Sequence, residues 1–151
     1  MTAKTEKYVY VTYIRTTPQK LWDALTQKEF QKKYWFDMHQ DSDWKAGAKW
    51  SMHFSDGRTA DAGEILEAAP PHRAVIKWRN EFRPELADEG FSRCTYEIAQ
   101  EGELCKLTVL HEIEAKAPSK FIEAVSGGWP KILSSLKTFL ETGAPLPRPA
   151  G

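Results

Sequence analysis

The chain has 151 residues, of which 41% are hydrophobic and 28% charged, and its 21 lysines and arginines balance its 21 aspartates and glutamates. This length is typical of one globular domain. The neutral balance and the absence of a basic cluster argue against a nucleic-acid partner, and no apolar run approaches the ~20 residues of a membrane span. We expect one cytoplasmic domain over residues 7–143, with flexible tails at 1–6 and 144–151 and no membrane insertion.

The first strand is expected at Lys7–Arg15, where β-branched and aromatic residues predominate. This composition predicts a strand that is covered on both faces. Thr17 and Pro18 then predict a helix start, with Thr17 as the N-cap and Pro18 as the first helical residue. A capping box over Thr26 to Glu29 predicts a second short helix. Two short helices are therefore expected after the first strand.

Four further strands are expected at 36–43, 48–54, 58–67 and 74–82, followed by a charged loop at 83–90 that is long enough to move. The dipeptide Asp56-Gly57 predicts a two-residue hairpin turn. This turn favours a register in which Asp61 and Gly63 point inward and Gly63 lies opposite Trp50. The opposite facing of the strand, with Ala60 inward, stays open.

The last two strands are expected to form a hairpin with alternating apolar residues on one face. A turn centred on Glu101-Gly102 brings the apolar faces together and pairs Tyr96 with Leu107, because a slip of one residue would place Leu107 opposite a polar side chain. In this register Cys94 and Cys105 lie too far apart to form a disulfide. Both are expected to be buried thiols.

The only long helical pattern runs from Pro118 to Glu141. Apolar residues recur every three or four positions, which predicts one buried stripe. Pro118 suits the first helical turn, and Gly143 suits the position just past the C-terminus. One long amphipathic helix and much sheet indicate a sheet wrapped around the helix. The stripe consists of Phe121, Val125, Trp129, Ile132, Leu133, Leu136, Phe139 and Leu140.

The middle of this helix contains Gly127-Gly128-Trp129-Pro130. Glycine is a weak helix former, and an internal proline removes one hydrogen bond of the helix, so a bend is expected here. Two interpretations stay open. The bend follows a curved sheet, or it lifts the first half of the helix away from the sheet and leaves a cavity that Trp129 faces.

No phosphate-binding loop, nucleophile elbow, metal-binding helix motif or CxxC pair occurs, so neither a metal nor a cofactor is expected. Three of the four histidines, His39, His53 and His72, are scattered, with His53 facing outward and His72 in a loop. His111 is different because it lies on the inner face of its strand. It is either a core residue with satisfied hydrogen bonds or a polar anchor in an apolar pocket.

Several motifs in this order resemble bacterial single-domain homologues of the activator of heat-shock-protein-90 ATPase, within the SRPBCC (START-like) superfamily. The resemblance covers residues 7 to 143 and implies an α+β helix-grip fold, in which a seven-stranded antiparallel sheet grips the long helix around a cavity for an apolar ligand. The co-chaperone members carry an additional N-terminal domain, for which this chain has no room. The motifs are Thr17-Pro18-Gln-Lys-Leu21-Trp22-Asp-Ala24-Leu25, Trp35, Phe54-Ser-Asp-Gly57, Pro70-Pro71 followed by Trp78, and Gly128-Trp129-Pro-Lys-Ile-Leu133-Ser-Ser-Leu136.

Three functions follow as hypotheses. The first is binding, without catalysis, of a small hydrophobic molecule such as a lipid, polyketide or flavonoid-like compound. The second is contact with a chaperone through charged strand faces at 49–53 and 77–79. The third is a cyclase or hydrolase that uses His111 as acid or base, oriented by Asp61 or Tyr96. The residues expected to contact the hydrophobic ligand are Trp35, Trp50, Met52, Phe54, Trp78, Tyr96, His111, Trp129 and Leu133.

Overall fold

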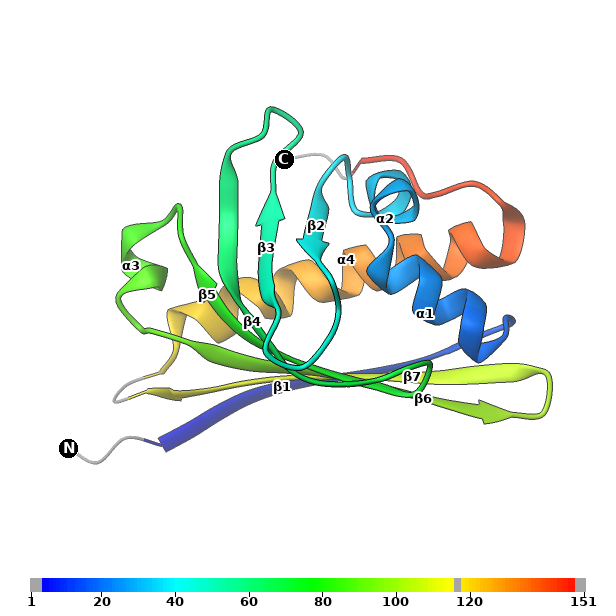
Figure 1. Ribbon diagram of the computed structural model, residues 1–151, viewed down its shortest axis with the longest axis horizontal. Helices are drawn as coiled ribbons and strands as arrows, with labels where there is room; N and C mark the ends of the chain where they lie inside the picture. Colours follow the sequence, from blue (N-terminus) through cyan, green and yellow to red (C-terminus); the bar gives the residue numbers. More distant parts are fainter. Residues whose placement is uncertain (1–3, 116–117, 149–151) are drawn as a thin grey trace.

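The computed structural model describes residues 4–115 and 118–148, and it shows the expected α+β helix-grip fold (Figure 1). Seven antiparallel strands form one sheet in the order β1-β7-β6-β5-β4-β3-β2, and α4 crosses one face of it. The strands are β1 (Lys4–Ile14), β2 (His39–Ser42), β3 (Lys49–His53), β4 (Thr59–Ala69), β5 (Arg73–Asn80), β6 (Ser92–Glu101) and β7 (Leu104–Ala115). The helices are α1 (Pro18–Thr26), α2 (Lys28–Tyr34), α3 (Pro84–Ala87) and α4 (Lys120–Thr142).

Strand β1 lies at one edge of the sheet and is covered on one face only. Tyr8 and Tyr10 pack against the core, whereas Val9, Val11 and Tyr13 are 50%, 44% and 43% exposed. The prediction that both faces of this strand are covered was wrong, because α4 packs on the inner face and the described residues provide no second layer outside. Among the described residues, no helix has both the length and the hydropathy of a membrane span.

The two short helices after β1 are present, and one of their two predicted caps is correct. Thr17 caps α1, since its Oγ1 accepts a hydrogen bond from the backbone N–H of Lys20 at 3.2 Å. The predicted capping box at 26–29 is wrong. Thr26 is the last residue of α1 and its hydroxyl donates to the carbonyl of Trp22, while α2 starts after Gln27 without a side-chain cap. A helical threonine often bonds back in this way to the carbonyl four residues earlier.

Two predicted segments differ from the structure. The strand expected at 36–43 is shorter, because Phe36 and Asp37 have left-handed backbone conformations (φ 50° and 69°) and form a turn before β2. The loop expected at 83–90 contains the short helix α3, which begins at Pro84. In Figure 1 this segment lies near the N-terminal end of α4.

The β3–β4 hairpin has the predicted facing, with Gly63 opposite Trp50 and Asp61 inward opposite Met52. The turn is one residue longer than expected, and an extra residue on β4, Ala60, restores the register. Only glycine fits at position 63, because a Cβ there would lie 1.7 Å from the carbonyl oxygen of the neighbouring strand. The close approach of β5 thus depends on this glycine.

The β6–β7 hairpin has the predicted faces but not the predicted register. Tyr96 lies opposite Val109 rather than Leu107, because the turn is centred on Gly102-Glu103, one residue later than expected. A shift of two residues along the partner strand leaves every side chain on the same face. The alternation of apolar residues therefore could not distinguish the two registers. Both cysteines are free and buried, as predicted.

Helix α4 begins later than predicted. Ser119 is its N-cap and accepts a hydrogen bond from the N–H of Ile122 at 3.0 Å, so Pro118 precedes the helix. Gly143 ends it in the left-handed conformation (φ 86°), as expected. The helix continues through Pro130 as one element, and its buried stripe includes Phe121, Trp129, Leu133, Ser135 and Leu136.

The C-terminal residues 144–148 have no regular secondary structure but contact the domain. The N–H of Leu146 donates to Ser135 Oγ at 3.2 Å, and the guanidinium of Arg148 donates to the carbonyl of Phe36 at 2.8 Å. In Figure 1 this segment turns back from the end of α4 across α2. It therefore lies beside α2 and the turn that follows it.

Candidate ligand-binding cavity

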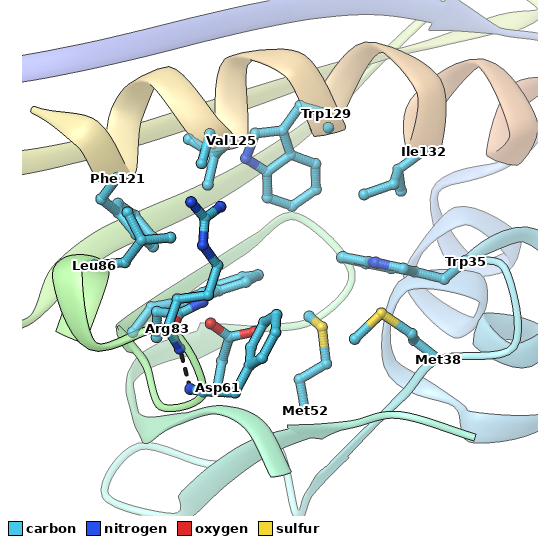
Figure 2. A pocket seen from close by; sticks show the side chains of 15 residues that line it. Trp35, Met38, Met52, Asp61, Arg83, Leu86, Phe121, Val125, Trp129 and Ile132 are labelled. Carbon is cyan, nitrogen blue, oxygen red and sulfur yellow. Dashed lines mark hydrogen bonds between the residues drawn. The ribbon is translucent and has the colours of Figure 1, made fainter. Parts of the chain in front are cut away.

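A cavity of about 230 Å³ lies between the first half of α4 and the strongly curved part of the sheet (Figure 2). This is the side of the helix where a bend was expected to leave space, and Trp129 lies on the cavity wall. The cavity reaches solvent beside Phe82 and Arg83, both of which are exposed. Its walls are formed by Trp35, Met38, Met52, Asp61, Trp78, Asn80, Phe82, Arg83, Leu86, Phe121, Ala124, Val125, Gly128, Trp129 and Ile132.

Three tryptophans from three separate elements form the rigid part of the wall. Trp129 comes from α4, Trp35 follows the last residue of α2, and Trp78 lies on β5. The ring of Trp129 lies 5.5 Å from that of Trp35 and 5.9 Å from that of Trp78, both edge to face. Figure 2 shows Trp129 and Trp35 on either side of one space. All three are at most 5% exposed, so their rings are held by the core.

The rim of the cavity is held by two hydrogen-bonded contacts. Asn80 Oδ1 accepts from the backbone N–H groups of Phe82 (3.2 Å) and Arg83 (2.8 Å), which fixes the turn after β5. Glu89 accepts from Ser119 Oγ at 2.5 Å and from the N–H of Lys120 at 2.8 Å. A carboxylate at a helix N-terminus is favourable because the helix dipole is positive there. Glu89 therefore fastens the α3 segment to the start of α4.

Asp61 is the one acidic side chain in the cavity wall. It is 8% exposed, and among the described residues no hydrogen bond of normal geometry reaches its carboxyl. Burial raises the pKa of Asp61 to about 7, although the nearby Trp78 and Asn80 side chains oppose the shift. The indole Nε1 of Trp78 is also buried without a hydrogen-bond partner. Trp78 and Asn80 thus lie close to the carboxyl of Asp61 and favour its charged form, and all three side chains border the cavity.

His111, in contrast, has both ring nitrogens occupied. Trp129 Nε1 donates to His111 Nδ1 at 3.1 Å, and His111 Nε2 lies 2.9 Å from Ser92 Oγ. The hydroxyl of Ser92 donates to the carbonyl of Trp78 at 2.8 Å. With the proton of the neutral imidazole on Nε2, each donor in this series of hydrogen bonds therefore has an acceptor. Burial lowers the pKa of His111 to about 3. His111 is therefore a neutral link between α4 and the sheet.

The expected ligand contacts fall into two groups. Four of them, Trp35, Met52, Trp78 and Trp129, border the cavity. The other five lie outside its wall. Phe54 packs against Phe82 near the rim, and Trp50 lies behind Trp78 with ring centres 4.5 Å apart. The remaining three, Tyr96, His111 and Leu133, are at most 1% exposed in the packed core.

Sequence reasoning did not include most of the rim in the site. Phe82, Arg83 and Leu86 come from the turn after β5 and from α3, whose position over the cavity has no local sequence signal. Along α4 a signal existed. Phe121, Val125, Gly128 and Ile132 follow the helical spacing of one face, and all four border the cavity. The expected orientation of His111 by Asp61 or Tyr96 was wrong, since Trp129 and Ser92 bond its ring.

The chemistry of the cavity favours binding of an apolar molecule. Within residues 4–115 and 118–148, no group of three His, Cys, Asp or Glu side chains is arranged to hold a metal ion. A second hollow of about 290 Å³ lies between α1 and the end of α4, near Phe30 and Phe139. Its charged members, Lys20 and Asp23, are not buried, so it lacks an unsatisfied polar group of the kind Asp61 provides.

Comparison with known proteins places the fold and the family. The structure resembles MLL2253 from Mesorhizobium loti (TM-score 0.76, 20% identity, 89% of this chain and 96% of that chain). It also resembles PFC0360w, described as an HSP90 activator from Plasmodium falciparum (TM-score 0.72, 21% identity, 89% and 95% covered), and CalU16 from Micromonospora echinospora (TM-score 0.72, 19% identity, 96% and 86% covered).

Identity at this level shows the fold alone, and a search of curated proteins found no significant match. The model of the family described as Activator of Hsp90 ATPase homolog 1-like protein matches residues 15–141. The chain belongs to this family, as its sequence motifs indicated.

Proposed function

We propose that the protein binds a small hydrophobic molecule in the cavity beneath the first half of α4. The observation that carries this proposal is a solvent-connected space with largely apolar walls into which one buried carboxyl projects. Ligand sites combine apolar walls with a few polar groups that fix orientation. A core that served packing alone would gain nothing from a buried carboxyl without a counter-charge.

The size of the cavity limits the ligand. An apolar cavity of ~150 Å³ is enough to hold benzene. At about 230 Å³, the present cavity suits a molecule of one ring or a compact pair of rings. The opening beside Phe82 leaves room for a substituent that extends into solvent. A flat aromatic compound therefore fits better than a long-chain lipid.

The six tryptophans allow a direct test, because each indole N–H gives its own signal in a ¹H–¹⁵N spectrum. Toluene added to the protein should shift the signals of Trp35, Trp78 and Trp129 in a saturable manner. Trp22 on α1 and Trp44 before β3 do not border the cavity, so their signals should stay in place. Absence of any saturable shift would contradict the proposal.

A pair of glycine variants provides a matched control. Gly128 borders the cavity and Gly127 is exposed with open space around its Cβ position. Gly128→Leu should fill the cavity and abolish the toluene shifts. Gly127→Leu makes the same change in composition on the solvent side and should leave the shifts intact.

A second candidate function, contact with a chaperone, is supported by a different surface. The exposed side chains of Val9, Val11 and Tyr13 form an apolar stripe along the outer face of β1. One structural relative is described as an HSP90 activator. Stimulation of the cognate Hsp90-type ATPase by the parent protein, and its loss in Val11→Glu, would support this function. If the parent protein neither binds nor stimulates the chaperone, the candidate fails.

No catalytic function is proposed, because His111 uses both ring nitrogens in the core.

A further inference from the structure

The carboxyl of Asp61 is the feature of the cavity that most restricts the chemistry of a ligand. Figure 2 shows its oxygens pointing from β4 into the space below α4. The residue is 8% exposed, and the described side chains around it supply no hydrogen bond of normal geometry. The neutral side chains of Trp78 and Asn80 approach the carboxyl, but no described ion pair includes it, so a positive charge is the property to expect in the ligand.

The walls around this carboxyl are aromatic. Trp35, Trp78 and Trp129 border the same space, and Phe82 lies at its opening. Aromatic rings attract cations through their quadrupoles, and indole does so most strongly. A carboxylate among aromatic rings therefore offers an organic cation both a counter-charge and polarisable walls, whereas an anionic ligand would meet repulsion from Asp61.

We infer that the cavity binds an aromatic amine, with the ring of the ligand against the tryptophans and its ammonium group on the carboxylate of Asp61. This inference rests on the proposed ligand-binding function and names the class of ligand. The volume of about 230 Å³ suits an arylalkylamine of one ring. The ammonium would supply a counter-charge and charge-assisted hydrogen bonds to the carboxylate.

The other charged groups near Asp61 are few. Glu81 raises the pKa of Asp61 by like-charge repulsion, which adds to the effect of burial. Arg83 at the opening is bonded to Glu85 at 2.7 Å, so its charge is largely offset. The residues that α4, β3 and the end of α2 contribute to the wall are all uncharged.

Three probes of similar size separate the possible ligand chemistries. Phenethylamine is the cationic probe, 2-phenylethanol is its neutral counterpart, and phenylacetate is its anionic counterpart. Calorimetry and indole N–H shifts at pH 8 should show that the amine binds at least tenfold more tightly than the alcohol, and that phenylacetate binds most weakly. Asp61→Asn should reduce the affinity for the amine about tenfold and change that for the alcohol less than twofold. Glu81→Gln removes an equal charge outside the cavity wall and should change the amine affinity less than threefold.

The pH dependence of binding in the parent protein tests the inference without a variant. With a pKa of about 7 for Asp61, the affinity for phenethylamine should fall about tenfold from pH 8 to pH 6, because the carboxylate must be ionised. The affinity for 2-phenylethanol should stay constant. Equal affinities for amine and alcohol, an amine affinity that Asp61→Asn leaves unchanged, or a flat pH profile would each overturn the inference. In that case toluene binding still decides the proposed function. If no probe binds, both fail.

Discussion

Two buried polar side chains on the inner face of one sheet have opposite surroundings. His111, on β7 under the middle of α4, is completely buried and donates or accepts at both ring nitrogens. Asp61, on β4 at the open end of the same face, is almost as buried and has no partner of normal geometry among the described residues. The contrast indicates which part of the space below α4 serves packing and which part is left for a ligand.

The physical difference lies in what faces each side chain. Trp129 and Ser92 reach His111 from α4 and β6, so its region is closed by side chains and hydrogen bonds. In the cavity wall that includes Asp61, α4 contributes the small residues Ala124 and Gly128 between larger apolar ones. Helix α4 therefore covers both the packed core around His111 and the cavity that contains Asp61.

The largest expected effect comes from removing His111, whose two ring nitrogens are both hydrogen-bonded in the core. His111→Ala removes a buried ring and leaves Trp129 Nε1 without its acceptor. Loss of packing and of hydrogen bonds together should lower the free energy of unfolding by about 4 kcal/mol. Urea denaturation measures this change. If the cost is below ~1 kcal/mol, His111 is not the link described above.

A substitution at Asp61 should raise the stability of the protein, whereas the substitution at His111 lowers it. The folded state raises the pKa of Asp61 above its unfolded value, so this group favours folding below the unfolded pKa and loses that contribution as pH rises through about 7. Asp61→Asn removes this dependence. The variant should gain stability relative to the parent protein between pH 4 and pH 8, by on the order of 2–4 kcal/mol. A constant difference across this range would contradict a buried carboxyl with a raised pKa.

The variants at Gly127 and Gly128 separate an effect on ligand affinity from an effect on stability. Gly128→Leu should reduce the affinity for toluene at least tenfold, about 1.4 kcal/mol. It should not lower the melting temperature, since the new side chain enters empty space and leucine is a better helix former. Gly127→Leu should leave affinity unchanged. Equal loss of affinity in both variants would indicate a general effect on the helix rather than a filled cavity.

The smallest expected effect comes from Ser92, the last side chain in the series of hydrogen bonds that links Trp129, His111 and Ser92. Ser92→Ala removes the hydroxyl that joins His111 Nε2 to the carbonyl of Trp78. One buried hydrogen bond of this type should contribute about 1 kcal/mol. Urea denaturation of Ser92→Ala and of the double variant with His111→Ala measures the coupling. Fully additive costs would show that the two side chains do not act together.

Alternation predicted that His111 faces inward, whereas the facing of Asp61 stayed open and was only favoured by the predicted hairpin turn. Alternation has a period of two, so it left the β6–β7 register uncertain by two residues. The hydrogen-bonded state of the two side chains was not predictable either. The partners of His111 lie 18 and 19 residues away in the sequence, on two other elements, and the space beside Asp61 depends on how α3 and α4 meet.

The most direct test of the central claim locates a bound molecule in the protein. Intermolecular nuclear Overhauser effects can be measured between unlabelled toluene and the isotope-labelled protein. We expect contacts from toluene to Met52, Val125 and the ring of Trp129, which border the cavity at its different walls. Contacts confined to Phe30 and Phe139 in the hollow beside α1, or to Val9 and Val11 on the outer face, would contradict this assignment.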